Sequence, residues 1–240
     1  VQKSEVRKLI DWRPFAMTWG MKPRDLHETD TGEELMDDAW DMLDLMLDNT
    51  DIKRENNINF KSRNLQNGAS INVAFSINPC LKTGQDVTVS DDRREIKFNF
   101  IRQPMQKTSG ANLCLSDFLH EKDWIGCFAV WVDGIDQKAE MLKRSGDDYR
   151  AIMMQALGDR LAEATAEWIH REVREKHWGY DDGSLSLDQI IDEKFQGIRP
   201  APGYPACPDH TQKIKILNWL NISKSEINLT EGLAMEPKSA

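Results

Sequence analysis

Ser70-Ile-Asn-Val-Ala-Phe-Ser-Ile77 carries an apolar side chain at every second position. Such alternation is typical of a strand that buries one of its faces. Residues 87–89 and 96–100 alternate in the same way. The dipeptide Thr83-Gly84 separates the first two of these segments, and Asn67-Gly68 precedes them; both are turn signals. Together they predict an antiparallel meander of three or four strands.

Helical periodicity flanks these strands. The residues Thr31-Gly-Glu-Glu34 read as a capping box, and Asp147 or Asp148 is expected to cap a longer helix. Helices are expected over residues 31–49, 148–178, 188–194 and 212–220. The buried stripe of the longest one is expected to hold Ile152, Met153, Ala156, Leu157, Leu161, Ala164, Trp168 and Val173.

Residues 124–132 form a nearly continuous apolar run that fits a buried central strand. Helices, strands and helices therefore follow one another, with no alternation of single strands and single helices. This order predicts an α+β fold with a mostly antiparallel sheet.

A break is expected near the start of the chain, in Ile10-Asp-Trp-Arg-Pro-Phe15. Pro14 disfavours helical backbone at Arg13. We therefore place Asp11 at or near the break, with Trp12 and Phe15 packing on either side of it.

Size and charge restrict the class of protein. The 240 residues are 40% hydrophobic, enough for one large or two small domains, and the net charge is -9. An acidic chain argues against a nucleic-acid partner, because phosphate binding needs clustered Lys and Arg. No stretch approaches the length of a membrane span and no signal peptide opens the chain, so we expect a cytoplasmic protein without a membrane partner. Because the first residue is Val1, we expect a fragment of a longer protein.

The cysteines and histidines do not predict a metal site. Four cysteines (Cys80, Cys114, Cys127 and Cys207) include no CxxC pair, and the five histidines are scattered. We expect reduced thiols. The chain also lacks a glycine-rich dinucleotide loop, a P-loop and a nucleophile elbow, which argues against a Rossmann-type methyltransferase. No residue is assigned a catalytic role.

The loop of residues 197–211 is the main candidate site. It holds four of the nine prolines, which fix the backbone and leave carbonyl groups free to accept hydrogen bonds. Gly203 permits close approach of a ligand, Arg199 suits a carboxylate, and Tyr204 offers a flat face. A stiff connecting loop, with Arg199 paired to a nearby acid, explains the same residues equally well.

Four segments resemble one known family, and they occur in that family's order. They are Asp11-Trp-Arg-Pro-Phe15, Tyr149 to Glu167, Gln196-Gly-Ile-Arg-Pro-Ala-Pro-Gly-Tyr-Pro205 and Leu229-Thr-Glu-Gly-Leu-Ala-Met235. All are similar to the S-adenosylmethionine (AdoMet)-binding reactivation domain of cobalamin-dependent methionine synthase. The resemblance is weak over residues 50–104. It implies a single C-shaped domain of residues 1–240 with a central twisted antiparallel sheet flanked by helices.

The resemblance also implies a ligand site. In that family the acid at the Asp11 position binds the amino group of AdoMet and the arginine at the Arg199 position binds its carboxylate. The surrounding contacts are implied to come from Pro200, Ala201, Gly203 and Tyr204. Glu193 is a further acid that could face the sulfonium or the amino group; a solvated residue of a short helix is the alternative.

The resemblance places a second site on the segment Asp159-Arg-Leu-Ala-Glu163. Asp159 and Glu163 lie four residues apart and share a helix face with Arg160 between them. In the family this region faces the cobalamin-binding module. An ordinary solvated helix face is the alternative.

The implied function is reactivation by reductive methylation. Flavodoxin or a flavoprotein reductase supplies an electron, and the methyl group of AdoMet passes to the cobalt of cobalamin, which a partner module carries. The homocysteine, folate and cobalamin sites belong to other modules. The family's AdoMet site also includes an aromatic pair beyond the Leu-Ala-Met segment, and the chain ends at Ala240, before it. We therefore expect a C-terminal truncation. A second hypothesis is an interaction module that docks on a corrinoid protein without methyl transfer from AdoMet.

Overall fold

The computed structural model describes residues 3–48, 53–54, 59–61, 69–104 and 110–240. The chain forms two compact units. The first comprises Val1–Val73, Val130–Lys194 and Glu236–Ala240, and the second Ala74–Ala129 and Phe195–Met235.

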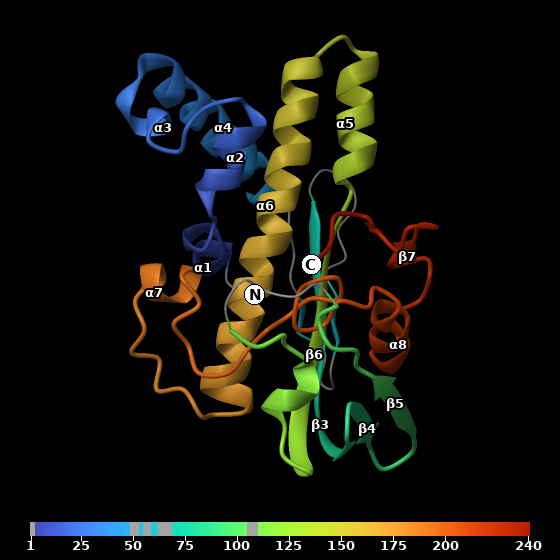
Figure 1. The fold of residues 1–240 in the computed structure, drawn as a ribbon. Coiled ribbons are helices and arrows are strands. Elements are labelled where there is room, and N and C mark those ends of the chain that lie inside the picture. Colours follow the sequence, from blue (N-terminus) through green and yellow to red (C-terminus); the bar gives the residue numbers. More distant parts are fainter. Residues whose placement is uncertain (1–2, 49–52, 55–58, 62–68, 105–109) are drawn as a thin grey trace. The chain divides into compact units, whose positions relative to one another are not determined.

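The main helices are α1 (Lys3–Lys8), α2 (Trp12–Thr18), α3 (Asp25–Glu28), α4 (Asp30–Asp48), α5 (Ile135–Arg144), α6 (Asp148–Glu172), α7 (Leu187–Ile191) and α8 (Gln212–Trp219) (Figure 1). The strands are β1 (Lys53–Arg54), β2 (Asn59–Lys61), β3 (Ser70–Thr83), β4 (Asp86–Ser90), β5 (Glu95–Asn99), β6 (Lys122–Asp133), β7 (Asn228–Leu229) and β8 (Met235–Glu236).

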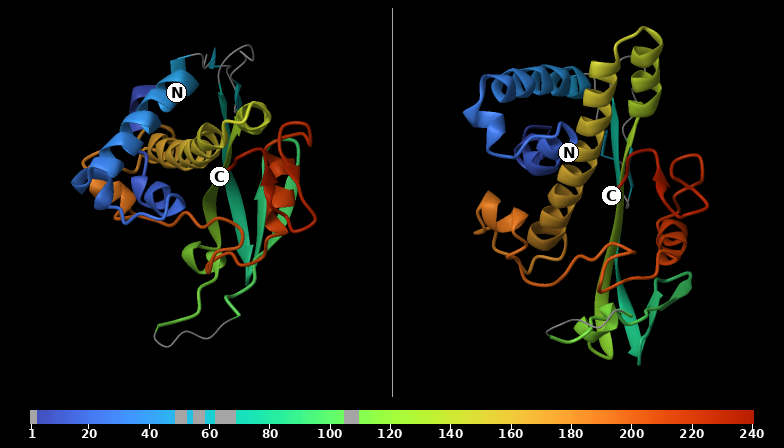
Figure 2. Two further views of the ribbon diagram at one scale, coloured as in Figure 1. Left: turned by 90° about the horizontal axis from the view of Figure 1, so that it is seen from above. Right: turned by 45° about the horizontal axis from the view of Figure 1, so that its top comes forward.

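The long helix α6 organises the first unit. Asp147 caps it by accepting a hydrogen bond from the backbone N–H of Arg150, as expected. It continues into a π-helical turn, Val173–His177. Helices α1, α2, α4 and α5 all contact α6, and Figure 2 shows α5 running beside it. Gly158 permits the close approach of α5, because a Cβ there would lie 2.9 Å from Cγ2 of Ile135.

The meander of strands is confirmed. β3, β4 and β5 pair antiparallel, with Cys80 opposite Val89 and Val87 opposite Phe98. The turn between β3 and β4 contains Gly84 with φ 64°, as the Thr83-Gly84 signal predicts. β3 also pairs with β6, and β1 pairs antiparallel with β2. The turn expected at residues 67–68 lies outside the described residues.

The end of the chain pairs with β6. The N–H groups of Val130 and Val132 donate to the carbonyls of Ala240 and Lys238 at 2.8 Å each, and the N–H of Ala240 donates back to Val130 at 3.0 Å. The last three residues thus lie antiparallel along the part of β6 that belongs to the first unit, where Val130, Trp131 and Val132 are buried.

The second unit has its own core under the meander. Trp219 of α8 is buried there, and its indole N–H contacts Ser76 Oγ at 3.0 Å and Asn78 Oδ1 at 3.1 Å. Helix α8 contacts β5. The core cluster consists of Cys80, Val87, Val89, Phe98, Phe100, Cys114, Cys207 and Trp219. The expected α+β fold, an antiparallel sheet flanked by helices, is confirmed.

The break expected near Asp11 is present, because α1 ends at Lys8 and Asp11 caps α2, but two details of the prediction are wrong. Arg13 lies within α2 despite the following proline, because Pro14 occupies the first turn of the helix, where its missing N–H has no helical partner to lose. The rings of Trp12 and Phe15 do not lie on opposite sides of a break. They contact each other edge to face, with centroids 5.3 Å apart.

Three other local expectations need correction. The cap of α4 is Thr29, not Thr31, because Thr29 Oγ1 accepts from the N–H of Gly32 at 3.1 Å. Ile152 is 43% exposed, whereas the other seven residues predicted for the stripe are buried. The helix expected over residues 188–194 ends at Ile191, so Glu193 lies beyond it.

Candidate functional site

The loop of residues 197–211 folds into compact turns within the second unit. The N–H of Tyr204 donates to the carbonyl of Ala201 at 3.1 Å, and the N–H of Gly203 donates to that of Cys207 at 2.8 Å. The N–H of Cys207 donates to the carbonyl of Tyr204 at 2.9 Å. The loop is therefore ordered by its own backbone as well as by its prolines.

Gly203 is required by the geometry of this loop. Its φ of 110° is one that side-chain-bearing residues rarely adopt. A Cβ there would also lie 2.2 Å from Cε1 of His210. The imidazole ring thus packs directly against the backbone of Gly203. His210 was not among the predicted site residues.

The base of the loop is fixed to the core of the second unit. Ala206 and Cys207 are buried, and the carbonyl of Ala206 accepts a hydrogen bond from the N–H of Leu115 at 2.7 Å. Burial raises the pKa of Cys207 to about 11, so its thiol stays protonated. At the end of the loop, the carboxylate of Asp209 accepts from the N–H of Thr211 at 2.9 Å.

The predicted ligand-contacting residues of the loop reach its surface. Tyr204 is 64% exposed. Ala201 and Gly203 are exposed, and Arg199 and Pro200 are half-buried. A fixed base with an accessible tip suits a loop that binds a small molecule through backbone groups and a guanidinium.

Asp11 caps α2 in the first unit. Its side chain accepts from the backbone N–H of Arg13 at 3.0 Å. The guanidinium of Arg13 also forms a bidentate pair with it, through Nε–Oδ1 at 2.8 Å and Nη2–Oδ2 at 2.9 Å. Partial burial would raise the pKa of Asp11, but these hydrogen bonds and the charges of Arg13 and Arg160 lower it. Asp11 is therefore ionised at neutral pH and suited to bind a cation.

Glu193 lies just beyond α7 and is exposed. Its φ of 56° is left-handed, which ends the helical path at this point. The preceding residue, Asp192, is close enough to Arg13 for its charge to help raise the pKa of that guanidinium. Asp192 therefore adds negative charge in the surroundings of Arg13.

The three helix residues predicted to face a partner lie together on α6. Arg160 lies three residues before Glu163, and Nη2 of Arg160 lies 3.9 Å from Oε1 of Glu163. Lys238 pairs with Asp159, with Nζ–Oδ1 at 3.1 Å and Nζ–Oδ2 at 3.3 Å. Both acids therefore have a cation nearby, which offsets the repulsion expected between them.

The predicted residues divide between the two units. Asp11, Asp159, Arg160, Glu163 and Glu193 belong to the first unit, and Arg199, Pro200, Ala201, Gly203 and Tyr204 to the second. Within the first unit, the positive charge of Arg160 helps to lower the pKa of Asp11. This electrostatic effect links the predicted ligand residue to the predicted partner-facing segment.

Comparison with known proteins identifies the family. The family model described as the activation domain of vitamin B12-dependent methionine synthase matches residues 2–240. The chain belongs to this family. A solved structure, described as the crystal structure of the MetH reactivation domain bound to AdoHcy (S-adenosylhomocysteine), is 37% identical to it. That match covers 100% of this chain and 74% of the other, with a TM-score of 0.81. The chain is thus a module of a cobalamin-dependent methionine synthase.

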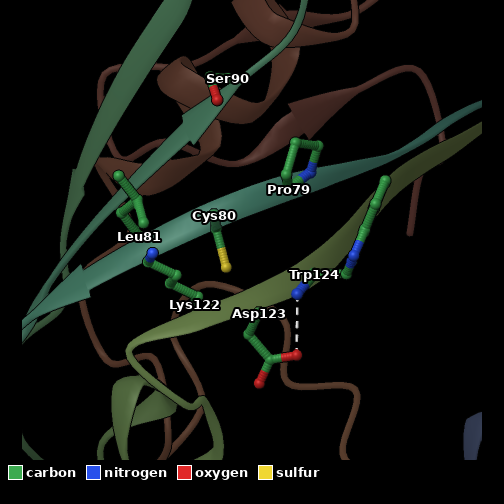
Figure 3. A pocket seen from close by; sticks show the side chains of 7 residues that line it. All are labelled: Pro79, Cys80, Leu81, Ser90, Lys122, Asp123 and Trp124. Atoms are coloured by element: carbon green, nitrogen blue, oxygen red, sulfur yellow. Dashed lines mark hydrogen bonds between the residues drawn. The ribbon is translucent and has the colours of Figure 1, made fainter.

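The activation domain also has a shallow cavity that contains none of the predicted residues. It measures about 280 Å³ and lies in the second unit, where Cys80, Asp123 and Trp124 are among its lining residues (Figure 3). The Oδ1 atom of Asp123 accepts from the N–H of Trp124 at 2.8 Å. The Oδ2 atom accepts from the N–H of His120 at 2.9 Å, so both oxygens of this carboxylate have backbone donors.

Two general features of the activation domain concern metals and membranes. Among the described residues, no group of three or more His, Cys, Asp or Glu side chains is placed to hold a metal ion. No helix in the same part of the chain has both the length and the apolar character that a bilayer span requires.

Sequence reasoning missed three residues that act on the predicted site. Arg13 pairs with Asp11, His210 packs on Gly203, and Lys238 pairs with Asp159. An arginine two residues after a helix-capping aspartate is a signal that could have found the first. The other two contacts depend on turns and on strand pairing, which local sequence patterns do not specify.

Proposed function

We propose that the activation domain binds AdoMet and presents it for reductive methylation of cobalamin carried by another module of the enzyme. The shape of the loop from Arg199 to Tyr204 carries this proposal. Its base is fixed to the core and its tip is accessible, and Gly203 has a conformation that a side chain would strain. The AdoHcy-bound relative supports the choice of ligand, because AdoHcy is AdoMet without the transferred methyl group.

The charged residues would bind the amino acid end of the ligand. Arg199 would hold the carboxylate through two parallel N–H donors, and Asp11 would accept hydrogen bonds from the amino group. Pro200, Ala201, Gly203 and Tyr204 would supply backbone groups and a ring face. Glu193 would add a second negative charge near the ammonium or the sulfonium.

The domain itself would supply position and charge rather than acid–base chemistry. When bound, AdoMet would supply the methyl group and the reduced cobalt of the partner module would accept it. No general base is needed, since the sulfonium departs as a neutral thioether. The task of Arg199 and Asp11 is to fix the ligand so that its methyl group faces the partner.

The partner-facing segment is proposed to be Asp159, Arg160 and Glu163 on α6. These residues would contact the cobalamin-binding module, and the acids would receive a cationic group from it. We propose flavodoxin or a flavoprotein reductase as the electron donor, and the cytoplasm as the compartment. We also propose that residues 1–240 act as one functional domain.

Calorimetric titration with AdoHcy tests the ligand site. We expect Arg199→Ala to weaken binding by about 10- to 100-fold, the usual loss for a charged hydrogen-bonding group. Arg102→Ala is the matched control, because Arg102 is an arginine of the same unit that pairs with Asp117 and has no proposed ligand role. Asp11→Asn should weaken AdoHcy but leave 5′-methylthioadenosine, which lacks the amino acid end, unaffected.

Two results would overturn the proposal: an absence of binding by the unchanged domain, or an affinity that Arg199→Ala does not alter. Either result would favour the second hypothesis, a module that docks on a corrinoid protein without using AdoMet. Charge reversal at Glu163, with Glu163→Lys, would then be the variant that tests docking.

A further inference from the structure

A cation of the same chain already holds the carboxylate of Asp11. Nε of Arg13 donates to Oδ1 at 2.8 Å and to Oδ2 at 3.0 Å, and Nη2 donates to Oδ2 at 2.9 Å. This is the bidentate arrangement that makes arginine–carboxylate pairs specific. A guanidinium thus lies where the proposed function requires the ammonium of the ligand.

The two oxygens of Asp11 are held by different groups. Oδ1 accepts from the backbone N–H of Arg13, which is the cap of α2, as well as from Nε. For Oδ2, the contacts described above come from the Arg13 side chain alone. If the guanidinium moves away, the cap bond still orients the carboxylate, and Oδ2 becomes available to another donor.

The pair is also easily parted. The side chains of Arg13 and Asp11 are 56% and 30% exposed. Exposed ion pairs contribute about 1 kcal/mol or less to stability, because water can replace the partner, and the bidentate geometry places this pair at the upper end of that range. A better-oriented cation can therefore displace the guanidinium.

Arg13 has a second acid within reach of its charge. Asp192 is exposed, directly follows α7 and contributes to the raised pKa of the Arg13 guanidinium. Two other arginines of the first unit pair with other acids: Arg150 pairs with Asp147, and Arg24 pairs with Asp25. The negative charge of Asp192 therefore favours a guanidinium that has left Asp11.

We propose that Arg13 is an exchangeable counterion that holds Asp11 in the free domain, yields it to the amino group of the ligand, and turns to Asp192. The inference rests on the proposed function and deepens it. It makes Arg13 a specificity-determining residue. A simple amine must compete with a bidentate guanidinium, whereas an amino acid whose carboxylate is held by Arg199 delivers its ammonium at high local concentration.

The direction in which Arg13→Met changes the affinity for AdoHcy tests this exchange. Arg13→Met removes the competitor, so AdoHcy should bind about two- to fivefold more tightly, the range that an exposed ion pair supports. AdoHcy is the suitable probe because its amino acid end is neutral overall and it lacks the sulfonium charge. Binding of 5′-methylthioadenosine should be unchanged. If Arg13 instead orients Asp11 for the ligand, Arg13→Met would weaken AdoHcy binding.

Two further variants serve as controls for this measurement. Arg144→Met removes the same charge at an exposed pair with Glu140 in the same unit, and should leave the affinity for AdoHcy unchanged. Arg13→Lys keeps the charge but loses the fork of donors, and should give a smaller gain than Arg13→Met. It also serves if Arg13→Met fails to fold, which thermal unfolding would show.

The role of Asp192 is tested in a double-mutant cycle. Asp192→Asn should weaken AdoHcy binding by about twofold in the unchanged domain, since a displaced Arg13 then lacks its acceptor. The same change should have no effect in the Arg13→Met background. An equal effect in both backgrounds would overturn the exchange to Asp192.

The outcomes separate this inference from the function on which it rests. If the unchanged domain does not bind AdoHcy, both fail. If it binds and Arg199→Ala abolishes binding, but Arg13→Met leaves the affinity equal or lower, the proposed function stands and the exchange is wrong.

Discussion

The imidazole of His210 packs against the α-carbon of Gly203, so closely that a Cβ on Gly203 would lie 2.2 Å from Cε1 of the ring. Gly203 lies within the turns that follow Arg199, and His210 comes after them in the chain. Their contact closes these turns, which makes it a determinant of the loop's shape.

Gly203→Ala is expected to abolish AdoHcy binding, because alanine both meets the ring and is strained at a φ of 110°. His210→Ala should weaken binding less. The double variant should bind better than Gly203→Ala alone, since the clash is gone and the strain remains. Calorimetry measures all three affinities. Identical loss in the single and double variants would show that the ring contact is unimportant.

Arg174 is a buried cation that pairs with Asp181. Its side chain is 1% exposed and Nε lies 2.9 Å from Oδ2 of Asp181, whose side chain is 9% exposed. Asp181→Asn removes this charged partner from the buried guanidinium, so we expect a loss of about 3–5 kcal/mol in the free energy of unfolding. Chemical denaturation measures it. Asp182→Asn, at an exposed neighbouring acid, is the control and should cost far less.

The same pair predicts a dependence of stability on pH. The side-chain hydrogen bond from Arg174, with the N–H of Gly183, lowers the pKa of Asp181 below its usual value of 3.8. A lowered folded-state pKa contributes stability that is fully present above the unfolded-state pKa and is lost as pH falls through the folded-state pKa. Stability should therefore decrease below about pH 4. In Asp181→Asn this part of the decrease should be absent.

Two glycines in helices should respond differently to alanine. A Cβ on Gly32 would lie 2.0 Å from the backbone oxygen of Asp25, which cannot move without displacing α3. We expect Gly32→Ala to destabilise the fold by about 1–3 kcal/mol. At Gly158 the neighbour is the Ile135 side chain, which can yield. Gly158→Ala should cost less, because alanine's helix propensity offsets part of the strain. Denaturation midpoints would contradict this if the order were reversed.

Two thiols, those of buried Cys207 and half-buried Cys127, should resist alkylation. Burial raises the pKa of both Cys127 and Cys207 to about 11, so little thiolate is present at pH 8. Iodoacetamide should modify them slowly in the folded domain and rapidly after denaturation, as mass spectrometry of peptides would reveal. Fast modification of Cys207 at pH 8 would mean that the loop base opens readily.

Much of the fold follows from side-chain periodicity. The alternation in β3, β4 and β5 and the stripe on α6 are present in the sequence, and both elements form where expected. The helix at Trp12–Thr18 was not expected, because a residue before a proline disfavours helical backbone. A helix nevertheless tolerates proline in its first turn, which is where Pro14 lies. Ile152 is exposed because tertiary packing, not helical spacing, decides which side of α6 is covered.

The sequence names candidate site residues but does not predict the contacts that they make. The ligand residues came from a family resemblance, and their roles stay predictions. The pairing of Arg13 with Asp11 depends on a helix cap that the proline rule argued against. The left-handed backbone of Glu193, a residue type that does not favour it, is set by its surroundings and leaves no local signal.

Residues 238–240 cover the edge of β6 by pairing with its backbone. A buried apolar strand with unpaired N–H and C=O groups along its edge is a template for strands of other molecules. Here the N–H groups of Val130 and Val132 are already bonded to Ala240 and Lys238. Removing residues 238–240 would leave these two N–H donors without their partners, next to a run of valine and tryptophan. We therefore expect the first consequence of this removal to be self-association during folding, rather than loss of the ligand loop.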